Sequence, residues 1–413
     1  MSDPIQFPIQ LAPTLSDLQR RKIADTLTNL GLRLNRRFTP SETAAHRITV
    51  NGDELAWEVE GKMHPTLGTD LTKVVEILSF AHLKEDPQFP DRPILTQYDP
   101  QDLFLERIFE DMRKALSLER PPHNAHPTVI LQITHDVDNP QLRTAYQMAR
   151  AAVLRLKGDK AQSAPLWAAA QSAVLRRPDP FWCFETICQL ARQYGFKSTY
   201  FTFASYPGQH PRDPRYNSET PRYETALRTL AQDGHEIGLH SGIRYNDFAK
   251  PRSFLPTDPI KSHRAHYWSA PRNALEAWFD SMASAGITAD ASLSPQCCGS
   301  AMGSAYPLWF TTQSGRTLLL YPSQFMDTYQ MQENAQGAIL DALTPHVGAA
   351  IPPVLNLNWH VRVFSGIGPW KGYPESFTNL LETIIAKYDT RPMTVFQSTT
   401  FYKGQLNAYH FTP

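Results

Sequence analysis

The chain has 413 residues, enough for two average domains or for one barrel with an appendage. Its 40 basic and 40 acidic residues balance, so no overall field draws the protein to nucleic acid or to an anionic membrane, and any binding must be local. The N-terminus lacks the basic and apolar regions of a signal peptide, and no run of about 18 apolar residues predicts a membrane span. None of the four cysteines forms a CxxC pair. We therefore expect a cytoplasmic protein with reduced thiols, no nucleic-acid partner and no membrane span.

The first part of the chain predicts a small α+β domain. Helical spacing of apolar residues and turn signals predict helices over 14–35, 70–80 and 103–118, a hairpin over 47–59 with its turn at Asn51-Gly52, and a proline-rich loop over 86–100. This stretch contains no cluster of ligand-type side chains, and residues 121–127 have the composition of a linker. We therefore predict an accessory domain over 1–122 and a second domain over 123–413.

The second domain alternates helix and strand. The expected helices are 141–156, 165–176, 181–194, 224–231, 271–285 and 377–388, and the expected strands are 128–138, 198–203, 236–240, 317–321, 354–358 and 393–396. This alternation indicates βαβ units, and hence a distorted (β/α) barrel. The basic residues of the first two helices are interpreted as a solvated face, with an anionic partner as the alternative.

The stretch Thr128–Asp138 predicts a buried strand that ends in polar residues. Its apolar and β-branched residues have no helical period, and the run ends in His135, Asp136 and Asp138 before Asn139-Pro140. Two carboxylates at the end of a buried strand are costly unless they meet a metal or a cation. An alternative is that the aspartates only cap a loop or the next helix. The combination at a strand end favours a site.

These residues also carry a resemblance. Ile133-Thr-His-Asp-Val-Asp138 resembles the first motif of the polysaccharide deacetylase (NodB-homology) superfamily, and is closer to a divergent branch with THDVD after an N-terminal domain. Three further stretches resemble later elements in the expected order: Gly234–Ser241, Ser262–Tyr267 and Leu355–His360. The resemblance covers roughly 125–400 and implies an incomplete barrel of about seven strands, a (β/α)7-type fold.

The resemblance implies a hydrolase that removes an N-acyl group from a sugar or related metabolite. Such amide hydrolysis needs an activated water, a cation on the carbonyl oxygen and an acid for the leaving amine. A divalent metal supplies the first two, and zinc is expected, with cobalt, nickel, iron or manganese as alternatives. The implied roles are Asp138, His240 and His266 as metal ligands, Asp136 as base, His360 as acid, and Arg264 as an additional cation.

This sequence departs from the family pattern in two ways. Val137 separates the two aspartates, which are adjacent in the usual motif, so Asp136 and Asp138 could exchange roles. Four residues after His240, where the family has a second histidine, stands Arg244, and a guanidinium is no metal ligand. His266 is the first choice to fill that place and His263 the second.

Two other function classes remain open. The missing histidine favours a catalytically silent or metal-free barrel that binds carbohydrate in a polysaccharide pathway. A different hydrolytic or lyase reaction is also compatible, since a fold does not determine a function. In each case, the expected partner is a small molecule or a carbohydrate.

Overall fold

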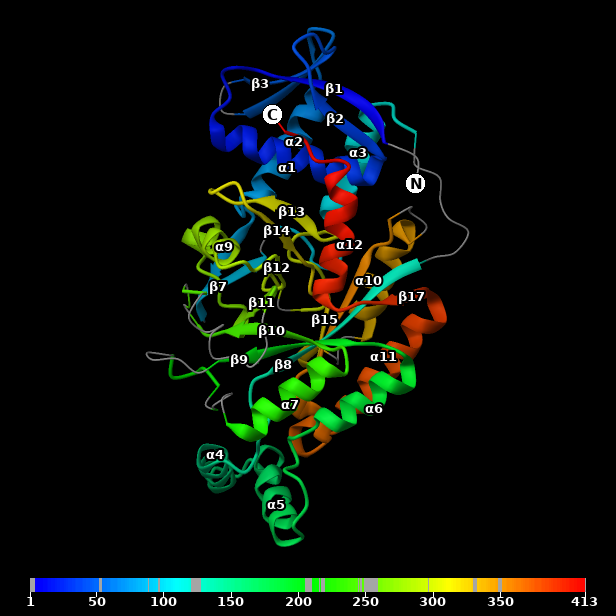
Figure 1. The fold of residues 1–413 in the computed structure, drawn as a ribbon. Helices are drawn as coiled ribbons and strands as arrows, with labels where there is room; N and C mark the ends of the chain where they lie inside the picture. Colours follow the sequence, from blue (N-terminus) through cyan, green and yellow to red (C-terminus); the bar gives the residue numbers. More distant parts are fainter. Residues whose placement is uncertain are drawn as a thin grey trace.

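The computed structural model describes residues 4–412 except for short internal gaps. The gaps are 52–53, 88, 96, 120–127, 205–209, 215, 217–219, 244, 246, 249–258, 296, 330–332 and 348–350. Two main sheets organise the described part: a five-stranded sheet near the N-terminus and a curled ten-stranded sheet in the rest of the chain. Figure 1 shows the N-terminal elements (blue) at one end of the larger sheet.

The N-terminal sheet has the strand order β2-β1-β3-β4-β5. Its strands are β1 (Ile5–Leu11), β2 (Arg36–Pro40), β3 (His46–Asn51), β4 (Glu54–Val59) and β5 (Lys62–Met63). β3 and β4 pair antiparallel, which confirms the predicted hairpin, while Gly52 of its turn lies outside the described residues. β1 and β2 are absent from the sequence-based prediction. β1 pairs in parallel with both β2 and β3, so α1 (Asp17–Leu34) serves as the crossover between β1 and β2.

Three helices accompany this sheet, and all three were predicted with shifted ends. α1 begins at Ser16, where Ser16 and Gln19 form a reciprocal capping box. α2 (Pro65–Leu78) begins five residues before its predicted start at 70, because the His64 side chain accepts the Leu67 N–H and Pro65 fits the first helical position. α3 covers Phe104–Ala115.

One predicted loop is wrong. Within 86–100 the chain forms β7 (Phe89–Leu95), which pairs antiparallel with β6 (Leu83–Asp86). Pro90 and Pro93 do not prevent this strand, because an isolated two-stranded hairpin leaves one edge of each strand unpaired. The predicted linker over 121–127 lies outside the described residues.

The larger sheet is the curled, incomplete barrel expected from the sequence. Its order is β13-β14-β12-β11-β10-β9-β8-β16-β15, with β17 paired to β8, and β13–β14 is the one antiparallel pair in this described order. The strands are β8 (Thr128–Val137), β9 (Ser198–Phe203), β10 (Glu236–Ser241), β11 (Ser262–Ala265), β12 (Ala289–Asp290), β13 (Leu308–Thr311), β14 (Thr317–Leu320), β15 (Phe325–Met326), β16 (Val354–Asn358) and β17 (Asp389–Pro392). Because neighbouring strands run in parallel, the carboxyl ends of β8, β10, β11 and β16 meet at one edge.

The helices of this domain lie around the curled sheet (Figure 1). They are α4 (Ala145–Leu156), α5 (Lys160–Val174), α6 (Phe184–Tyr194), α7 (Pro221–Gln232), α9 (Leu275–Ser284), α10 (Glu333–Leu343), α11 (Tyr373–Lys387) and α12 (Val395–Asn407). The predicted strand over 393–396 is wrong. The strand ends at Pro392, and Thr394 and Gln397 form a capping box that begins α12.

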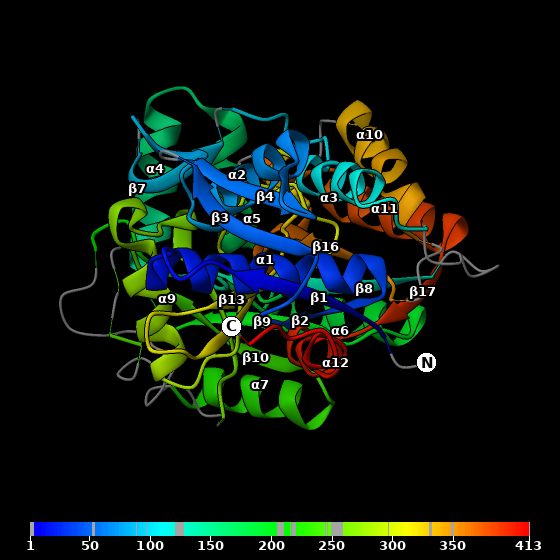
Figure 2. The same ribbon diagram turned by 90° about the horizontal axis from the view of Figure 1, so that it is seen from above.

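The N-terminal elements pack directly on the barrel, and Figure 2 shows α1 lying across its end. The Asn29 side chain bonds both backbone groups of Trp309 on β13, at 2.9 Å each. The Asp25 carboxylate accepts the backbone N–H of Thr311 at 3.0 Å. α1 therefore covers an edge strand of the barrel. The division at residue 122 stays a prediction. Among the described residues, no helix is both long and apolar enough to cross a membrane.

Candidate active site

The site begins at the end of β8. Asp136 is 3% and Asp138 6% exposed, and both carboxylates bond to side chains from other strands and loops of the barrel. The helix that follows is capped by Thr144 instead, so neither aspartate serves as a helix cap there. His135 has a structural part: its Nδ1 lies 2.8 Å from the Trp359 carbonyl oxygen and its Nε2 lies 3.1 Å from Ser198 Oγ.

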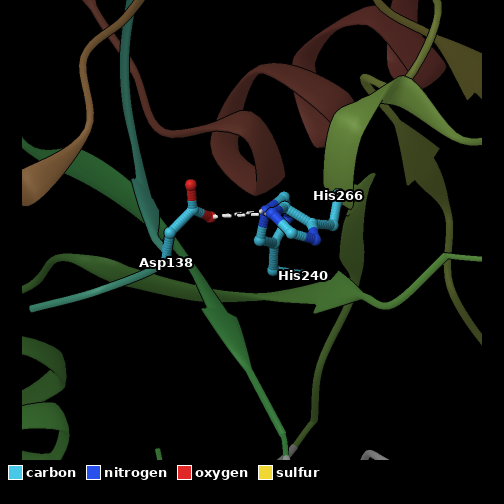
Figure 3. A group of neighbouring side chains, drawn as sticks. All are labelled: Asp138, His240 and His266. Carbon is cyan, nitrogen blue, oxygen red and sulfur yellow. Dashed lines mark hydrogen bonds and ion pairs between the residues drawn. The ribbon is translucent and has the colours of Figure 1, made fainter. Parts of the chain in front are cut away.

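Asp138, His240 and His266 form a buried group that could hold a metal ion. One ligand atom from each lies within 4.8 Å of the other two. Oδ1 of Asp138 is 3.1 Å from Nε2 of His240 and 3.9 Å from Nε2 of His266. Figure 3 shows the two imidazoles converging on one side of the carboxylate. The three side chains come from the ends of β8 and β10 and from the short helix η1 (His266–Trp268).

Hydrogen bonds at the other ring nitrogen orient both imidazoles. Nδ1 of His240 donates to the backbone oxygen of Arg264 at 2.9 Å, and Nδ1 of His266 lies 3.1 Å from Oδ1 of Asp213. With a proton on Nδ1, each neutral ring directs the lone pair of Nε2 towards Asp138. Histidines that bind metals in proteins are fixed in this way through the second nitrogen. One carboxylate and two oriented imidazoles therefore fit a divalent ion.

Backbone geometry helps to place His266. Tyr267 and Trp268 both have left-handed φ angles, 54° and 56°. Bulky residues rarely adopt this conformation, and where the surrounding structure maintains it, it often marks a functional site. Just before this turn, the His266 ring lies with its centre 5.3 Å from the centre of the His240 ring.

His263 belongs to a different buried chain of side chains. Its Nδ1 lies 2.7 Å from Oδ1 of Asp290, and its Nε2 lies 2.7 Å from Oγ of Ser241. Successive residues on a strand point to opposite faces, so His263 and Arg264 leave β11 in opposite directions. His266, the first choice from the sequence, is the histidine that shares the group with Asp138 and His240. Arg244 lies outside the described residues.

Asp136 is enclosed by two donors from neighbouring strands. Nη1 of Arg264 donates to Oδ1 at 3.0 Å, and Nδ2 of Asn358 donates to Oδ2 at 2.9 Å. Burial acts to raise the pKa of Asp136, but the charges of Arg264, His240 and His360 together outweigh it and lower the pKa, so the carboxylate stays ionised. Arg264 is fully buried and also donates to Thr134 Oγ1 at 2.9 Å. The arginine thus lies beneath Asp136 and fixes it.

His360 lies between two carboxylates. Its Nδ1 is 2.8 Å from Oδ2 of Asp327, which also accepts the His360 backbone N–H at 2.6 Å. Its Nε2 is 3.0 Å from Oδ2 of Asp138. Burial acts to lower the pKa of His360, but the charges of Asp327 and Asp138 outweigh it and raise the pKa to about 10. The imidazole is therefore protonated at neutral pH.

The sequence analysis missed three charged residues at this site. Nη1 of Arg362 donates to Oδ2 of Asp138 at 3.0 Å, while Asp213 and Asp327 hold His266 and His360. Asp327 directly follows the strand β15, as Asp138 directly follows β8. Asp213 follows no strand, and its neighbourhood in sequence gives no comparable signal.

A cavity of about 240 Å³ reaches Asp138 and His266, two members of the buried group that could hold a metal ion. Asp138, His266 and Arg362 line it, and Gln147, Arg150, Ala151 and Leu154 of α4 supply one wall. Arg212, Phe181, Tyr267 and Trp370 also line it, so the cavity combines three arginines with three aromatic rings. The guanidinium of Arg362 lies 5.4 Å from the centre of the Trp370 ring.

Comparisons with known proteins give distant likenesses. No model of a known protein family matches the chain, and no curated protein matches it. Among solved structures, the Puue allantoinase gives a TM-score of 0.43 at 15% identity, over 69% of this chain and 95% of that chain. A probable polysaccharide deacetylase from Pseudomonas aeruginosa PAO1 gives 0.41 at 13% identity, over 71% of this chain and 95% of that chain. The polysaccharide deacetylase Bc1974 from Bacillus cereus gives 0.27 at 12% identity, over 62% and 88%. Likenesses at this level carry no argument about the reaction, which rests on the site's own geometry.

Proposed function

We propose that the protein is a metal-assisted hydrolase of a non-peptide carbon–nitrogen bond, acting on the N-acyl group of a sugar or related metabolite. The observation that carries the proposal is the convergence of Asp138 Oδ1 and the Nε2 atoms of His240 and His266 in a buried group. The ion is divalent; zinc suits the donor set best, and cobalt, nickel, iron or manganese are alternatives.

In the proposed reaction, one side chain of the protein accepts a proton and another donates one. A bound ion would supply Lewis acidity and lower the pKa of a water molecule. Asp136, ionised and fixed by Arg264 and Asn358, accepts the proton of the attacking water. His360, kept protonated by Asp327 and Asp138, donates a proton to the leaving nitrogen. In this scheme Arg264 positions the base and does not touch the substrate, because its side chain is fully buried.

The cavity indicates which substrates fit. A volume of about 240 Å³ suits one sugar-sized ring, and Tyr267 and Trp370 offer faces on which a ring can stack. Three lining arginines favour a substrate that carries an anionic group beside its N-acyl group.

One observation favours the metal-free, carbohydrate-binding alternative. Oδ2 of Asp138 already meets two cationic groups, the Arg362 guanidinium and the His360 imidazolium, each at 3.0 Å. These pairs would compensate the buried carboxylate without an ion. The alternative predicts ligand binding with no metal and no turnover.

Metal content and acetate release distinguish the two functions. We expect about one divalent ion per chain by elemental analysis of the purified protein, and acetate release from N-acetylated sugars with a carboxylate or phosphate group. His240→Ala and His266→Ala should lose both the ion and the activity. His410→Ala is the matched control and should lose neither, because this histidine packs beside Trp309 on β13, away from the site. A wild-type protein without metal that binds such sugars unchanged would establish the alternative.

A further inference from the structure

Exposed apolar side chains gather on α4, α5 and the residue after them. Of the eleven large hydrophobic side chains exposed in the described chain, five lie within residues 153–175. They are Val153 (48% exposed), Leu156 (89%), Trp167 (62%), Val174 (82%) and Leu175 (49%). Scattered exposed hydrophobic residues are ordinary, but such a concentration marks an interaction surface.

One face of α4 lines the active-site cavity, and the opposite face is exposed. Gln147, Arg150, Ala151 and Leu154 follow the i, i+3, i+4, i+7 spacing of one helical face, and they line the active-site cavity. The exposed residues Ala149, Ala152, Val153 and Leu156 follow the same spacing two positions later, which places them on the opposite face. α4 therefore has a mixed side with Gln147 and Arg150 towards the cavity, and a wholly apolar side away from it.

α5 continues the apolar surface. Trp167, Ala170 and Val174 are exposed at i, i+3 and i+7, so they form one stripe along the helix. Figure 1 shows α4 and α5 side by side at the end of the molecule opposite the N-terminal sheet. No other described element covers this stripe, since its large side chains remain at least half exposed.

The same surface is strongly basic in a chain with no net charge. Residues 141–177 contain seven basic residues and one acidic residue, Asp159. Five of the basic side chains are exposed and form no ion pair with another described side chain: Arg155, Lys157, Lys160, Arg176 and Arg177. Arg155 and Lys157 precede and follow Leu156 in the chain, so by helical geometry they lie on either side of the apolar face of α4.

We propose that the α4–α5 surface docks the protein onto a membrane of anionic phospholipid. An apolar stripe flanked by cations is the pattern of a helix lying in the lipid interface, with its apolar side chains among the acyl chains and its cations at the headgroups. Trp167 suits that depth, because an indole ring prefers the boundary between headgroups and hydrocarbon. A second copy of the chain fits less well, since it would bring two basic surfaces together.

Docking would bring the active-site cavity close to the membrane, with α4 between the cavity and the lipid. The helix that presents Leu156 to the lipid also forms one wall of that cavity. Substrate would then be met at a lipid surface. This inference goes beyond the proposed function and does not depend on it, because lipid binding can be measured without any turnover.

Co-sedimentation of the full-length protein with vesicles tests the proposal. We expect binding to phosphatidylcholine vesicles that contain about 30% phosphatidylserine, no binding to pure phosphatidylcholine, and loss of binding in high salt. Quenching of tryptophan fluorescence by brominated lipid should accompany binding and largely disappear in Trp167→Phe.

Substitutions at exposed positions distinguish binding through the α4–α5 surface from non-specific binding to vesicles. Leu156→Ser with Val174→Ser, and separately Lys157→Glu with Arg176→Glu, should each weaken binding at least about tenfold. Ile385→Ser and Lys62→Glu, exposed positions on α11 and β5, are matched controls and should bind as the wild type does. Circular dichroism should be unchanged in all variants. Absence of binding, equal binding of all variants, or a dimer in solution that Leu156→Ser with Val174→Ser dissolves would each overturn the proposal.

Discussion

Asp136 and Asp138 lie two positions apart on one strand face but have different neighbours. Asp136 meets Arg264 and Asn358, whereas Asp138 faces three imidazoles and Arg362. This difference supports our proposal that Asp136 accepts the proton and Asp138 binds the metal, which substitution can test.

Asp136→Asn should lower the hydrolysis rate by about 10²–10⁴-fold, the usual contribution of one general base, and leave the metal content unchanged. Asp138→Asn should lose the metal. The measurements are acetate release and elemental analysis, with the exposed Asp341→Asn as control. If Asp136→Asn loses the metal and Asp138→Asn retains it, the two aspartates have exchanged roles.

Asp213 would act on the proposed ion through His266. Its Oδ1 accepts from the ring and from the Ile243 N–H at 3.0 Å, and its Oδ2 accepts the His210 N–H at 2.9 Å. Asp213→Asn should therefore weaken zinc affinity about 10–100-fold while all three ligands remain. Competition with a chromophoric chelator measures this, and an affinity equal to that of the wild type would contradict the assignment.

At the scale of elements, Asn29 on α1 substitutes for a neighbouring strand. Its side chain satisfies both the N–H and the carbonyl of Trp309, two buried groups at the edge of β13. Asn29→Ala should lower the free energy of unfolding by about 1–3 kcal/mol for each polar group left unpaired. Urea unfolding measures the change, with the exposed Asn407→Ala as control. A variant as stable as the wild type would show that water replaces the amide.

Elements whose sequence pattern is local were predictable. β9 and β16 have the predicted ends, because their runs are β-rich and bounded by turn residues. The 393–396 strand failed because Thr394 and Gln397 act together as a helix cap, a signal that outweighs three apolar residues. β1 and β2 are missing from the prediction because each contains a proline, Pro8 and Pro40, which weakens the local strand signal.

Residues of the site could likewise be predicted only where the local sequence carries a signal. Its strand-end residues could be found one motif at a time, since each follows a buried strand. Asp213 and Arg362 could not, because what makes them part of the site is proximity after folding.

At the scale of the whole molecule, three buried histidines make the fold sensitive to acid. Burial lowers the pKa of His82 and of His235 to about 4 and that of His135 to about 3. Nδ1 of His235 accepts the Ser198 N–H at 3.0 Å, so a proton on that nitrogen would break the bond. Each ring therefore stays neutral in the folded protein.

The direction in which stability changes with pH follows from whether the folded or the unfolded chain binds the proton more readily. Between pH 6.5 and about 4, the unfolded chain takes up protons that the folded chain cannot, so stability is full above pH 6.5 and falls as the pH falls through this window. Each histidine can contribute up to about 1.4 kcal/mol per pH unit. Urea unfolding at several pH values should show this loss, and His82→Gln, which keeps a donor for Ala301, should reduce it. Equal stability at pH 7.5 and 4.5 would contradict the prediction.

The buried chain of Ser241, His263 and Asp290 has the connectivity of a serine-hydrolase triad, with 2.7 Å at each of its two links. Ser241 is 1% exposed, and its hydroxyl faces the interior, where no electrophile can reach it. A covalent warhead that reports serine hydrolases in a proteome would leave this protein unlabelled, whereas a chelating compound would find the Asp138 group open to the cavity. A search for serine hydrolases by triad geometry alone would therefore place the protein in the wrong inhibitor class, whereas profiling by reactivity would not.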